Sequence, residues 1–527
     1  MSDLLLVGGT VIDGTGAPGR TADVLIRDGL IHSVGTGSSI AGASVRDVTG
    51  KVVCPGFVDI HTHSDLTLLS NPAAVSKVTQ GVTTEVIGNC GLGVTPIPRG
   101  AAQTDIRQAV SYLDLDPAIA WTWENTAEYL AVVSGLHTSL NVATLTAHLP
   151  LHAGVVGFDD RPPTRSELDQ MVGLLSDSFQ AGSLGLSTGL VYAPLCYVGD
   201  PELAALGETV SAHDRVFTWH VRDYGDELIP SVLQALEIAR RTGCRTQISH
   251  LTAVGRRNWG RVRQALDLVD AAIADGLRIG VDIYPYLYGN APLAQLLPSW
   301  AQEGGPSGMS SRLPDEETRS RIRGEWASSA TEWEDITVSW VPGGHPSENL
   351  VGQTIAAIAV ATHTTGDDVA LDLLAELGFA VLMVAGGRNE DDLREVLDHP
   401  ASVVASDGLS LDPNGVTGAG SPHPRSYGCF PRFLSRYAGQ SDADFVTAIR
   451  KCTGAPAELI GIAERGALIA GATADIVVFS RDHLADRATF AAPQLLTDGI
   501  DLVFVGGEVV VEDGAHTGSR PGAVIRR

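Results

Sequence analysis

The segment Pro55-Gly56-Phe57-Val58-Asp59-Ile60-His61-Thr62-His63-Ser64-Asp65 places two histidines two residues apart at the end of an apolar run. A short apolar run that begins after Pro-Gly is typical of a buried β-strand. Because successive side chains of a strand alternate between its faces, His61 and His63 are expected to point the same way and to bind one metal ion. The pair alone is weak evidence, since two such histidines can also be core or solvated residues.

Seven further apolar runs follow, separated by Ala- and Leu-rich segments of helical character. The eight candidate strands are residues 57–63, 84–87, 140–146, 184–188, 216–221, 246–251, 279–283 and 403–406. Alternating strands and helices predict an α/β fold with a parallel sheet, and eight strands suggest a closed (β/α)8 TIM-like barrel. A doubly wound open sheet fits the alternation equally well, so the strand count favours the barrel without deciding between them.

Both ends of the chain contain short β-rich runs broken by Gly and Asp turns. These runs are residues 4–12, 22–26 and 30–34, and again residues 474–479 and 502–511. The last run is similar in sequence to residues 5–12. We therefore expect a small β-sandwich domain formed by both termini, residues 1–54 and 465–527, beside a barrel formed by residues 55–464.

One segment breaks the barrel pattern. Residues from about 291 to 335 are rich in Gly, Ser, Pro, Trp and charge, and they are too long for an ordinary loop. They follow a barrel strand, where active-site lids occur, so we interpret them as a lid insertion. A surface excursion without a catalytic role is the alternative.

The composition restricts the classes of partner. The 527-residue chain has 36 Lys and Arg against 62 Asp and Glu, a formal net charge of −26, so nucleic acid and anionic membranes are not expected partners. No apolar run reaches the length of a membrane span, and the N-terminus lacks the pattern of a secretory signal. The six cysteines are scattered without close spacing, which favours free thiols and a cytoplasmic location.

Polar groups recur at the ends of the predicted strands, where a barrel places its active site. They are His61, His63, Cys90, His220, His250 and Asp407. Four imidazoles, one thiol and one carboxylate are enough ligands for one or two Zn²⁺ ions with an open position. Each residue alone has an ordinary structural explanation, but six such residues at successive strand ends predict a metal centre. His148, at a further strand end, is expected to make a structural hydrogen bond.

These residues lie in motifs that resemble those of the amidohydrolase superfamily, and specifically of the N-acyl-D-amino-acid deacylases. The motifs are residues 55–65, then Gly81-Val82-Thr83-Thr84-Glu85-Val86-Ile87-Gly88-Asn89-Cys90-Gly91, residues 185–192, 282–286 and 406–408, and His423-Pro424-Arg425-Ser426-Tyr427-Gly428. The resemblance covers nearly the whole chain, and the motif that contains Cys90 is its most specific part.

The resemblance implies a site and a reaction. Cys90, His220 and His250 would hold one zinc tightly, His61 and His63 would form a second and often weakly occupied site, and Asp407, near the second site, would be the general base. Many relatives in the wider superfamily bridge two metals with a carbamylated lysine. Here the three lysines are Lys51, Lys77 and Lys451, and none lies in the fourth strand, so the thiolate of Cys90 is expected to supply the missing negative charge.

The expected reaction is hydrolysis of a linear amide bond in a small-molecule N-acyl substrate, because zinc lowers the pKa of bound water to roughly 7 and Asp407 can pass a proton to the leaving amine. Deacylation of N-acyl-D-amino acids, or of related D-residue amides or peptides, is the leading prediction. Hydrolysis of a cyclic amide, as in hydantoinases, is a second reading, which the absent lysine disfavours. A non-catalytic scaffold protein is a third, which the complete set of six groups disfavours.

The chain departs from the family in the residues after His250. The resemblance predicts a histidine and a carboxylate-binding lysine there, but the chain has Leu251 and Thr252. Thr252 can offer only a neutral hydrogen bond, so carboxylate recognition is expected to fall to other groups or to be unnecessary. Tyr284 and Arg425 are the candidates for carboxylate binding, Arg425 first because guanidinium binds carboxylate as a fork. Thr252 and Leu251 are also predicted to contact the substrate, with Leu251 making the pocket more apolar. Arg222 and Arg388 are weaker candidates, for which an ordinary ion pair is the simpler explanation.

Overall fold

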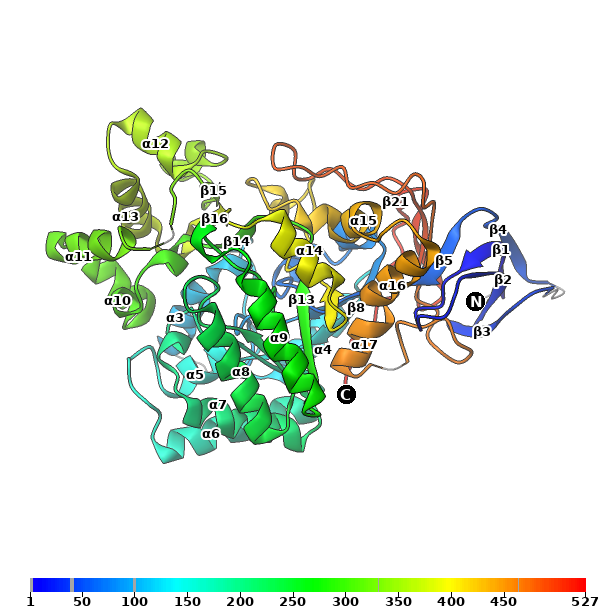
Figure 1. The fold of residues 1–527 in the computed structure, drawn as a ribbon, viewed down its shortest axis with the longest axis horizontal. Coiled ribbons are helices and arrows are strands. Elements are labelled where there is room, and N and C mark those ends of the chain that lie inside the picture. Colours follow the sequence, from blue (N-terminus) through cyan, green and yellow to red (C-terminus); the bar gives the residue numbers. More distant parts are fainter. Residues whose placement is uncertain (1–2, 38–41, 98–100, 330, 463) are drawn as a thin grey trace.

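The computed structural model describes residues 3–37, 42–97, 101–329, 331–462 and 464–527. Figure 1 shows a central barrel with a β-rich unit on one side and a helical insertion on the other. The barrel lies between the two ends of the chain in the sequence, whereas the β-rich unit collects strands from both ends.

The barrel is built from parallel strands in two hydrogen-bonded groups. The first group is β6 (Phe57–Asp59), β7 (Val82–Ile87) and β8 (Asn141–Thr144). The second is β9 (Thr146–Ala147), β10 (Gly185–Gly189), β11 (Val216–His220), β12 (Arg245–Ile248), β13 (Ile279–Ile283) and β17 (Ser402–Val404). Because β8 and β9 are two parts of one strand broken at Leu145, the eight predicted strands are all present.

Contacts between the first and last strands close the barrel. Thr62 and Gly408 form a parallel bridge, the amide of His63 donates to the carbonyl of Gly408 at 2.9 Å, and that of Asp407 donates to the carbonyl of His61 at 2.8 Å. Closure excludes the open doubly wound sheet, which has two free edges. It also brings the residues after β6 beside those after β17, although almost 350 positions separate them in the sequence.

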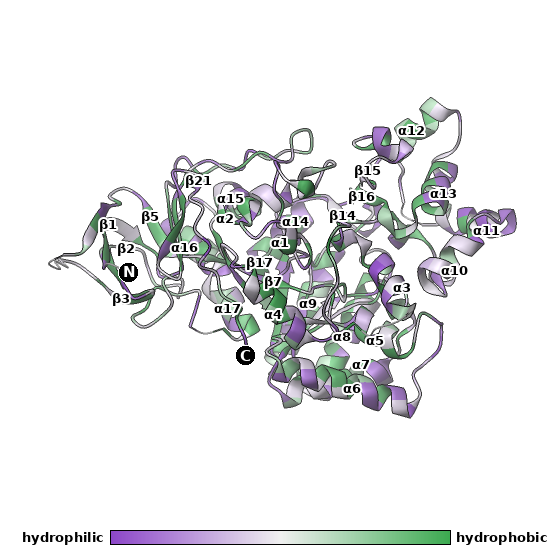
Figure 2. Cartoon of the chain, turned by 180° about the vertical axis from the view of Figure 1, so that it is seen from behind, coloured by the Kyte–Doolittle hydropathy of each residue, from purple (hydrophilic) through white to green (hydrophobic). Residues whose placement is uncertain are grey.

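Helices cover the outside of the barrel. They are α1 (Thr67–Ser70), α2 (Val75–Val78), α3 (Ala101–Ala109), α4 (Thr126–Gly135), α5 (His148–Val155), α6 (Arg165–Gln180), α7 (Asp200–Ala212), α8 (Leu228–Thr242), α9 (Arg261–Ala274), α14 (Glu390–Asp398), α15 (Arg425–Arg436), α16 (Asp442–Cys452) and α17 (Gly454–Ile460). Helix α6 begins with a capping box between Thr164 and Glu167 and buries Met171, Leu175 and Phe179. The mixed hydropathy along this helix in Figure 2 reflects one face packed on the barrel and one in water.

The strands at the two termini form the predicted small β domain, in which nine strands are linked by hydrogen bonds around one apolar core. Its strands are β1 (Leu4–Val11), β2 (Arg20–Arg27), β3 (Leu30–Gly35), β4 (Ser44–Asp47), β5 (Val52–Pro55), β18 (Ile476–Phe479), β19 (Ile500–Val505), β20 (Glu508–Glu512) and β21 (Ala515–His516). Antiparallel pairing of β5 with β18 joins the two ends of the chain. The predicted run 502–511 is a hairpin, because Gly506 and Gly507 turn the chain between β19 and β20.

The insertion after β13 is longer than the predicted segment 291–335 and has its own fold. It comprises β14 (Gly289–Pro292), α10 (Gly305–Arg312), α11 (Glu316–Trp326), β15 (Ile336–Trp340), α12 (Ile355–Thr362), α13 (Gly366–Leu377) and β16 (Leu382–Ala385). Its three strands form a separate antiparallel sheet, and its apolar side chains form a separate core around Met309, Ile322 and Leu374. The lid function stays a prediction.

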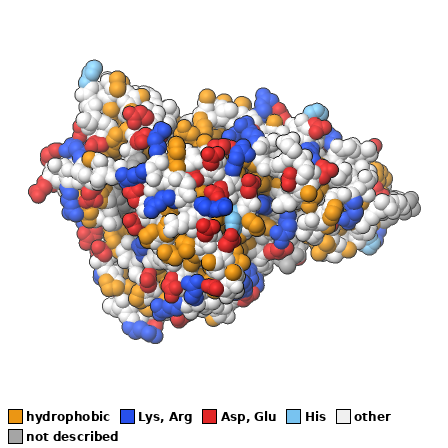
Figure 3. All heavy atoms as spheres, viewed as in Figure 1, with side chains coloured by type: hydrophobic (Ala, Val, Ile, Leu, Met, Phe, Trp, Pro, Cys, Tyr) orange, Lys and Arg blue, Asp and Glu red, His pale blue; other side chains and the backbone are white. Residues whose placement is uncertain are grey.

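The surface charge, the helices and the cysteines bear on where the molecule can act and on what it can bind. Figure 3 shows acidic and basic side chains interspersed over the visible face, so the excess of acidic residues makes no single large patch there. Within the described ranges, no helix combines the length and hydrophobicity needed to cross a bilayer. All six cysteines have free thiols.

Candidate active site

The six predicted ligand residues lie at one end of the barrel. His61 and His63 follow β6, Cys90 follows β7, His220 ends β11, His250 follows β12 and Asp407 follows β17. The strands β6 and β12 end earlier than predicted, at Asp59 and Ile248, so the histidines after them stand on loops rather than on strands. The two rings of His61 and His63 nevertheless lie near each other, with their centroids 5.5 Å apart, so their proximity comes from the loop and not from alternation along a strand.

Three of these loop residues have a left-handed backbone. The φ angles are 55° at Cys90, 35° at His250 and 50° at Asp407. Residues other than glycine adopt this conformation only at an energetic cost, and they do so mostly where a site fixes the direction of a side chain. At Cys90, His250 and Asp407 the tight turns aim the side chains over the mouth of the barrel.

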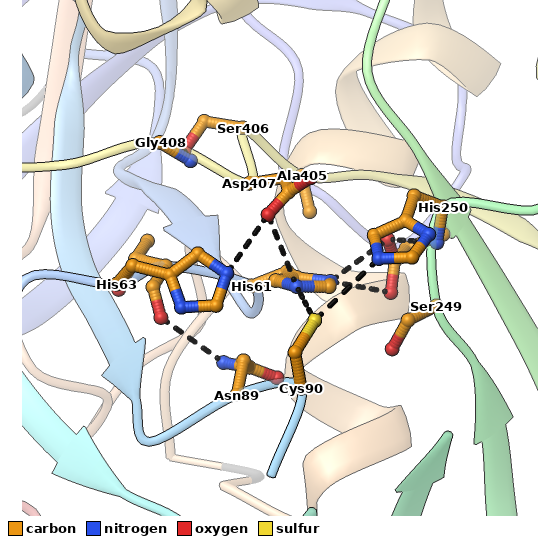
Figure 4. Close-up of polar contacts among 12 residues, drawn as sticks. His61, His63, Asn89, Cys90, Ser249, His250, Ala405, Ser406, Asp407 and Gly408 are labelled. Carbon is orange, nitrogen blue, oxygen red and sulfur yellow. Dashed lines mark hydrogen bonds and ion pairs between the residues drawn. The ribbon is translucent and has the colours of Figure 1, made fainter. Parts of the chain in front are cut away.

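Five of the side chains converge on one buried point (Figure 4). The Nε2 atom of His61 lies 3.1 Å from Cys90 Sγ and 3.4 Å from Asp407 Oδ1. His63 Nε2 lies 3.0 Å from the same Asp407 oxygen, and His250 Nε2 lies 3.5 Å from Cys90 Sγ. One atom each of His61, Cys90, His250 and Asp407 lies within 4.8 Å of every other, so these four can reach a common ion.

His220 lies beside this group rather than inside it. Its ring centroid is 4.7 Å from that of His250, and the two rings are nearly perpendicular. Both of its ring nitrogens are buried and have no hydrogen-bond partner among the described residues. Burial lowers the pKa of His220 to about 3, so the imidazole is neutral at physiological pH.

The donor set fits a zinc ion. A neutral imidazole with two unpartnered buried nitrogens is costly unless something accepts its lone pair, and a metal ion does so. Nitrogen, sulfur and carboxylate donors in this number are those that zinc prefers. Burial raises the pKa of the Cys90 thiol to about 11, although His61 opposes the rise, so Cys90 would bind a metal ion with release of its proton.

Asp407 is buried but ionised. Burial disfavours its charge, yet the guanidinium of Arg425 and the neighbouring His61 hold the pKa of this carboxyl well below its usual value. Arg425 Nη1 donates to Asp407 Oδ2 at 2.8 Å and Nη2 donates to the hydroxyl of Tyr112 at 3.3 Å. Arg425 is 1 % exposed and is not among the residues that line the cavity described below. One arm of its guanidinium is therefore bound to Asp407 and the other to Tyr112.

The sequence analysis did not assign a role to Asp282, which orients two of the histidines. Its Oδ1 lies 3.1 Å from His61 Nδ1 and accepts the backbone amide of His250 at 2.8 Å. The amide group of Gln247 donates to its other oxygen. A carboxylate bonded to the far nitrogen of a metal-binding histidine is the usual way to fix the ring. Its place in the 282–286 motif, at the end of a buried strand, was the available signal.

A second buried charged group lies beneath the site. Lys77, one of the three lysines, is fully buried, and its Nζ donates to Asp59 Oδ2 at 2.9 Å and to Ser406 Oγ at 2.6 Å. Glu85 Oε1 lies 3.2 Å from the same nitrogen. Because Asp59 and Ser406 immediately precede the loops that carry His61 and Asp407, this lysine ties those two loops together.

A cavity of about 370 Å³ opens over the convergence point. The predicted residues His63, Cys90, His220, His250, Thr252, Tyr284 and Asp407 line it, together with Arg222 and Arg388. Leu251 is fully buried and does not line it, because its side chain packs into the barrel core. Asn290, Gln295, Glu332 and other residues of the insertion form part of the wall.

His148 makes the expected structural hydrogen bonds, to Thr188 at 2.9 Å and to Glu202 at 2.8 Å. The same Glu202 oxygen lies 2.8 Å from His152 Nδ1. These three buried residues, His148, His152 and Glu202, link α5 to α7, and His148 also joins them to Thr188 of β10.

Comparisons with known proteins agree with this architecture. A family model described as the amidohydrolase family matches residues 44–232 and 360–511. An N-acyl-D-glutamate deacylase of Alcaligenes xylosoxydans xylosoxydans is 32% identical over 526 residues, covering 100% of this chain and 96% of that one. A D-aminoacylase of the same organism is also 32% identical and covers 100% and 98% of the two chains.

A solved structure shows the same fold. The N-acyl-D-glutamate deacylase of Bordetella bronchiseptica, complexed with zinc and a phosphonate inhibitor that mimics the tetrahedral intermediate, matches with a TM-score of 0.83 at 32% identity over 100% of both chains. The chain described here therefore belongs to the amidohydrolase family, in the group of the N-acyl-D-amino-acid deacylases.

Proposed function

We propose that this protein is a zinc-dependent amidohydrolase that removes the acyl group from N-acyl-D-amino acids or from related D-residue amides or peptides. The observation that carries the proposal is the meeting of imidazole, thiol and carboxylate groups at the base of a cavity sized for a small molecule. Family membership gives the reaction class, hydrolysis of a linear amide bond. The free thiols suit a reducing compartment, so we place the reaction in the cytoplasm.

We assign the tightly held zinc to Cys90, His220 and His250, and a second, weaker site to His61 and His63. The support is that Cys90 Sγ lies 3.1 Å from the nearer nitrogen of His61 and 3.5 Å from that of His250, so that one thiolate reaches both groups of ligands. When bound, zinc would supply Lewis acidity, activating a water molecule and polarising the scissile carbonyl.

Asp407 is the proposed general base and acid. Its Oδ1 faces the ligand group, 3.0 Å from His63 Nε2, while its Oδ2 is held by Arg425. An ionised carboxylate in this position can take a proton at Oδ1 and pass it to the departing amine nitrogen, which an amide requires because an amide anion is a poor leaving group. Arg425 and Asp282 position the reacting groups without touching the substrate.

The chain itself gives no support to the cyclic-amide alternative. Strand β10 (Gly185–Gly189), the fourth barrel strand, carries no lysine, and Lys77 is engaged with Asp59 beneath the site. The predicted lid is supported to the extent that the insertion contributes part of the cavity wall.

The test is amine release from matched N-acetyl-D- and N-acetyl-L-amino acids by protein loaded with zinc, by protein stripped with a chelator and by stripped protein given zinc again. We expect turnover of the D-compounds, its loss on stripping and its return with zinc. Equal turnover of the D- and L-enantiomers would contradict the assignment to D-amino acids. Undiminished turnover after verified removal of zinc would contradict the metal mechanism.

A further inference from the structure

We propose that Arg388 is the residue that recognises the carboxylate of the substrate, in place of the lysine that Thr252 replaces. The inference rests on the proposed function and names the substrate class more narrowly, as N-acyl-D-amino acids whose carboxylate is free. It is an assignment that the sequence disfavoured, since an ion pair was the simpler explanation for Arg388.

The first observation is that Arg388 has no acidic partner. Its Nε and Nη1 atoms are buried without a hydrogen-bond partner, and no ion pair involves it within the described part of the chain. Each other candidate is occupied: Arg425 binds Asp407, and Arg222 donates to Gln234 and to the carbonyls of Cys196 and Val198. Arg388 as a whole is half-buried, but its Nε and Nη1 are shielded from water without a hydrogen-bond partner or a counter-charge. An anion that enters the cavity would relieve part of that cost.

The second observation is the place of the guanidinium. Arg388 lines the same cavity as His220, His250 and Asp407, together with Thr252. Its Cζ lies 5.6 Å from the centre of the Tyr284 ring, another lining residue. A carboxylate in this cavity can therefore meet a cation and an aromatic hydroxyl, which together resemble the lysine and tyrosine that the family likeness predicts.

The third observation is that the chain leaves space for the guanidinium beside Gly289. A Cβ at this position would lie 2.7 Å from Arg388 Nη2 and 2.9 Å from Nη1, which is too close. Glycine at this point of β14 therefore lets the guanidinium lie against the backbone of the insertion. A methyl group there would displace the cation and leave its charge intact, which supplies a second way to test its role.

The experiment compares N-acetyl-D-leucine with its C-terminal amide, N-acetyl-D-leucinamide, on the zinc-loaded wild type, Arg388→Gln, Gly289→Ala and the control Arg263→Gln. Arg263 is an exposed arginine paired with Glu395 on the outside of the barrel. We expect the wild type to prefer the free acid, and Arg388→Gln to lose roughly 10- to 100-fold in kcat/KM for the acid, chiefly through KM, with little change for the amide. Gly289→Ala should shift KM for the acid in the same direction, and Arg263→Gln should change neither substrate.

Equal losses on acid and amide, or no loss on either, would overturn the role of Arg388 while leaving the proposed function intact. A wild type that hydrolyses the amide better than the acid would do the same. Failure of the wild type to hydrolyse either compound, or any other N-acetyl-D-amino acid, would instead overturn the proposed function. If Arg388→Gln does not fold, an unchanged KM for the acid in Gly289→Ala would overturn the inference.

Discussion

Asp407 combines three properties in one residue: a left-handed backbone, burial and a carboxyl whose pKa is held well below its usual value. The turn aims its carboxylate at the ligand group, and Arg425 makes its charge tolerable by a direct ion pair of 2.8 Å. Removing the charge while keeping the shape isolates its chemical role from its structural one.

We expect Asp407→Asn to retain zinc and to lose about 100- to 10,000-fold in kcat, because the amide cannot accept and return a proton. Zinc content by elemental analysis and amine release measure the two effects. Asp412→Asn, in the same loop but outside the ligand group, serves as the control. A turnover close to that of the wild type would remove Asp407 from proton transfer.

Cys90 should decide metal retention. We expect Cys90→Ala to retain less zinc than the wild type after dialysis against a weak chelator. Loss of a residue that only hydrogen-bonds to a metal ligand lowers metal affinity roughly 10- to 100-fold, and loss of the ligand Cys90 should lower it further. Cys196→Ala, which alters a half-buried thiol outside the cavity, should leave the zinc content unchanged. The same zinc content in both variants would contradict the ligand role of Cys90.

At the scale of elements, buried charged groups fix the loops after the strands. Lys77, on α2, joins Asp59 of β6 to Ser406 after β17. Burial works against the Lys77 charge, but Asp59 and Glu85 raise its pKa, so it is charged when folded. The two carboxylates beneath the site thus depend on one cation from a neighbouring helix.

We expect Lys77→Met to lower the free energy of unfolding by about 3–5 kcal/mol, since it leaves buried carboxylates without a counter-charge. Lys51→Met removes a lysine whose ion pair with Asp501 is about one-third exposed, and should cost about 1 kcal/mol or less. Urea denaturation of the two variants measures the difference. Equal free energies of unfolding for the two variants would show that Lys77 does not stabilise the fold by neutralising the buried carboxylates.

The Glu202 cluster predicts a dependence of stability on pH. Burial opposes the charge of Glu202, but hydrogen bonds from His148 and His152 outweigh it and lower its pKa to about 2 from 4.5. A carboxyl whose folded pKa is depressed stabilises the fold above its unfolded pKa, and that stabilisation is lost as the pH falls through 4.5 towards 2. The contribution at neutral pH is roughly 3 kcal/mol.

We therefore expect the difference in unfolding free energy between the wild type and Glu202→Gln to fall by more than half between pH 7 and pH 3. Glu208→Gln, on the exposed side of the same helix α7, should show no such trend. Urea titrations of the wild type and both variants at several pH values measure these differences in unfolding free energy. A constant difference across this range would mean that the charge of Glu202 does not stabilise the helix pair.

At the scale of the molecule, the C-terminal residues return to the barrel after completing the terminal sheet. The amide of Val142 donates to Ala523 at 2.9 Å, and that of Ile525 donates to Val142 at 2.8 Å. Gly522 lies so close to Leu140 that no side chain would fit. This tail runs beside β8, so that the predicted terminal unit is tied to the barrel at its far end as well as at β5.

We expect removal of residues 521–527 to lower the unfolding midpoint by several degrees, because β8 loses its partner on that edge. Removal of residues 526–527 alone, which deletes exposed contacts of Arg526 and Arg527, should have a smaller effect. Thermal denaturation followed by circular dichroism compares the two truncations. Identical midpoints for the longer truncation and the full chain would refute this role of the tail.

Much of this organisation could be predicted from local sequence patterns. The eight strands and the residues after them follow from apolar runs that end in polar groups, and their number favours a closed barrel without excluding an open sheet. The fold of the insertion could not be predicted, because residues 336–385 contain ordinary helix and strand patterns that read as part of the barrel. The partner of Arg425 could not be predicted either, since it depends on how the loop between β17 and α15 folds back over Asp407.

The left-handed turns at Cys90, His250 and Asp407 have a consequence for engineering and for evolution. Glycine would fit each turn better than the residue present, which bears a conformational cost on the order of 1 kcal/mol at each place. Selection for thermal stability alone, without selection for turnover, should therefore drive the metal-free protein towards replacement of its own ligands. Selection for stability alone would favour substitution at the active-site residues before most other positions.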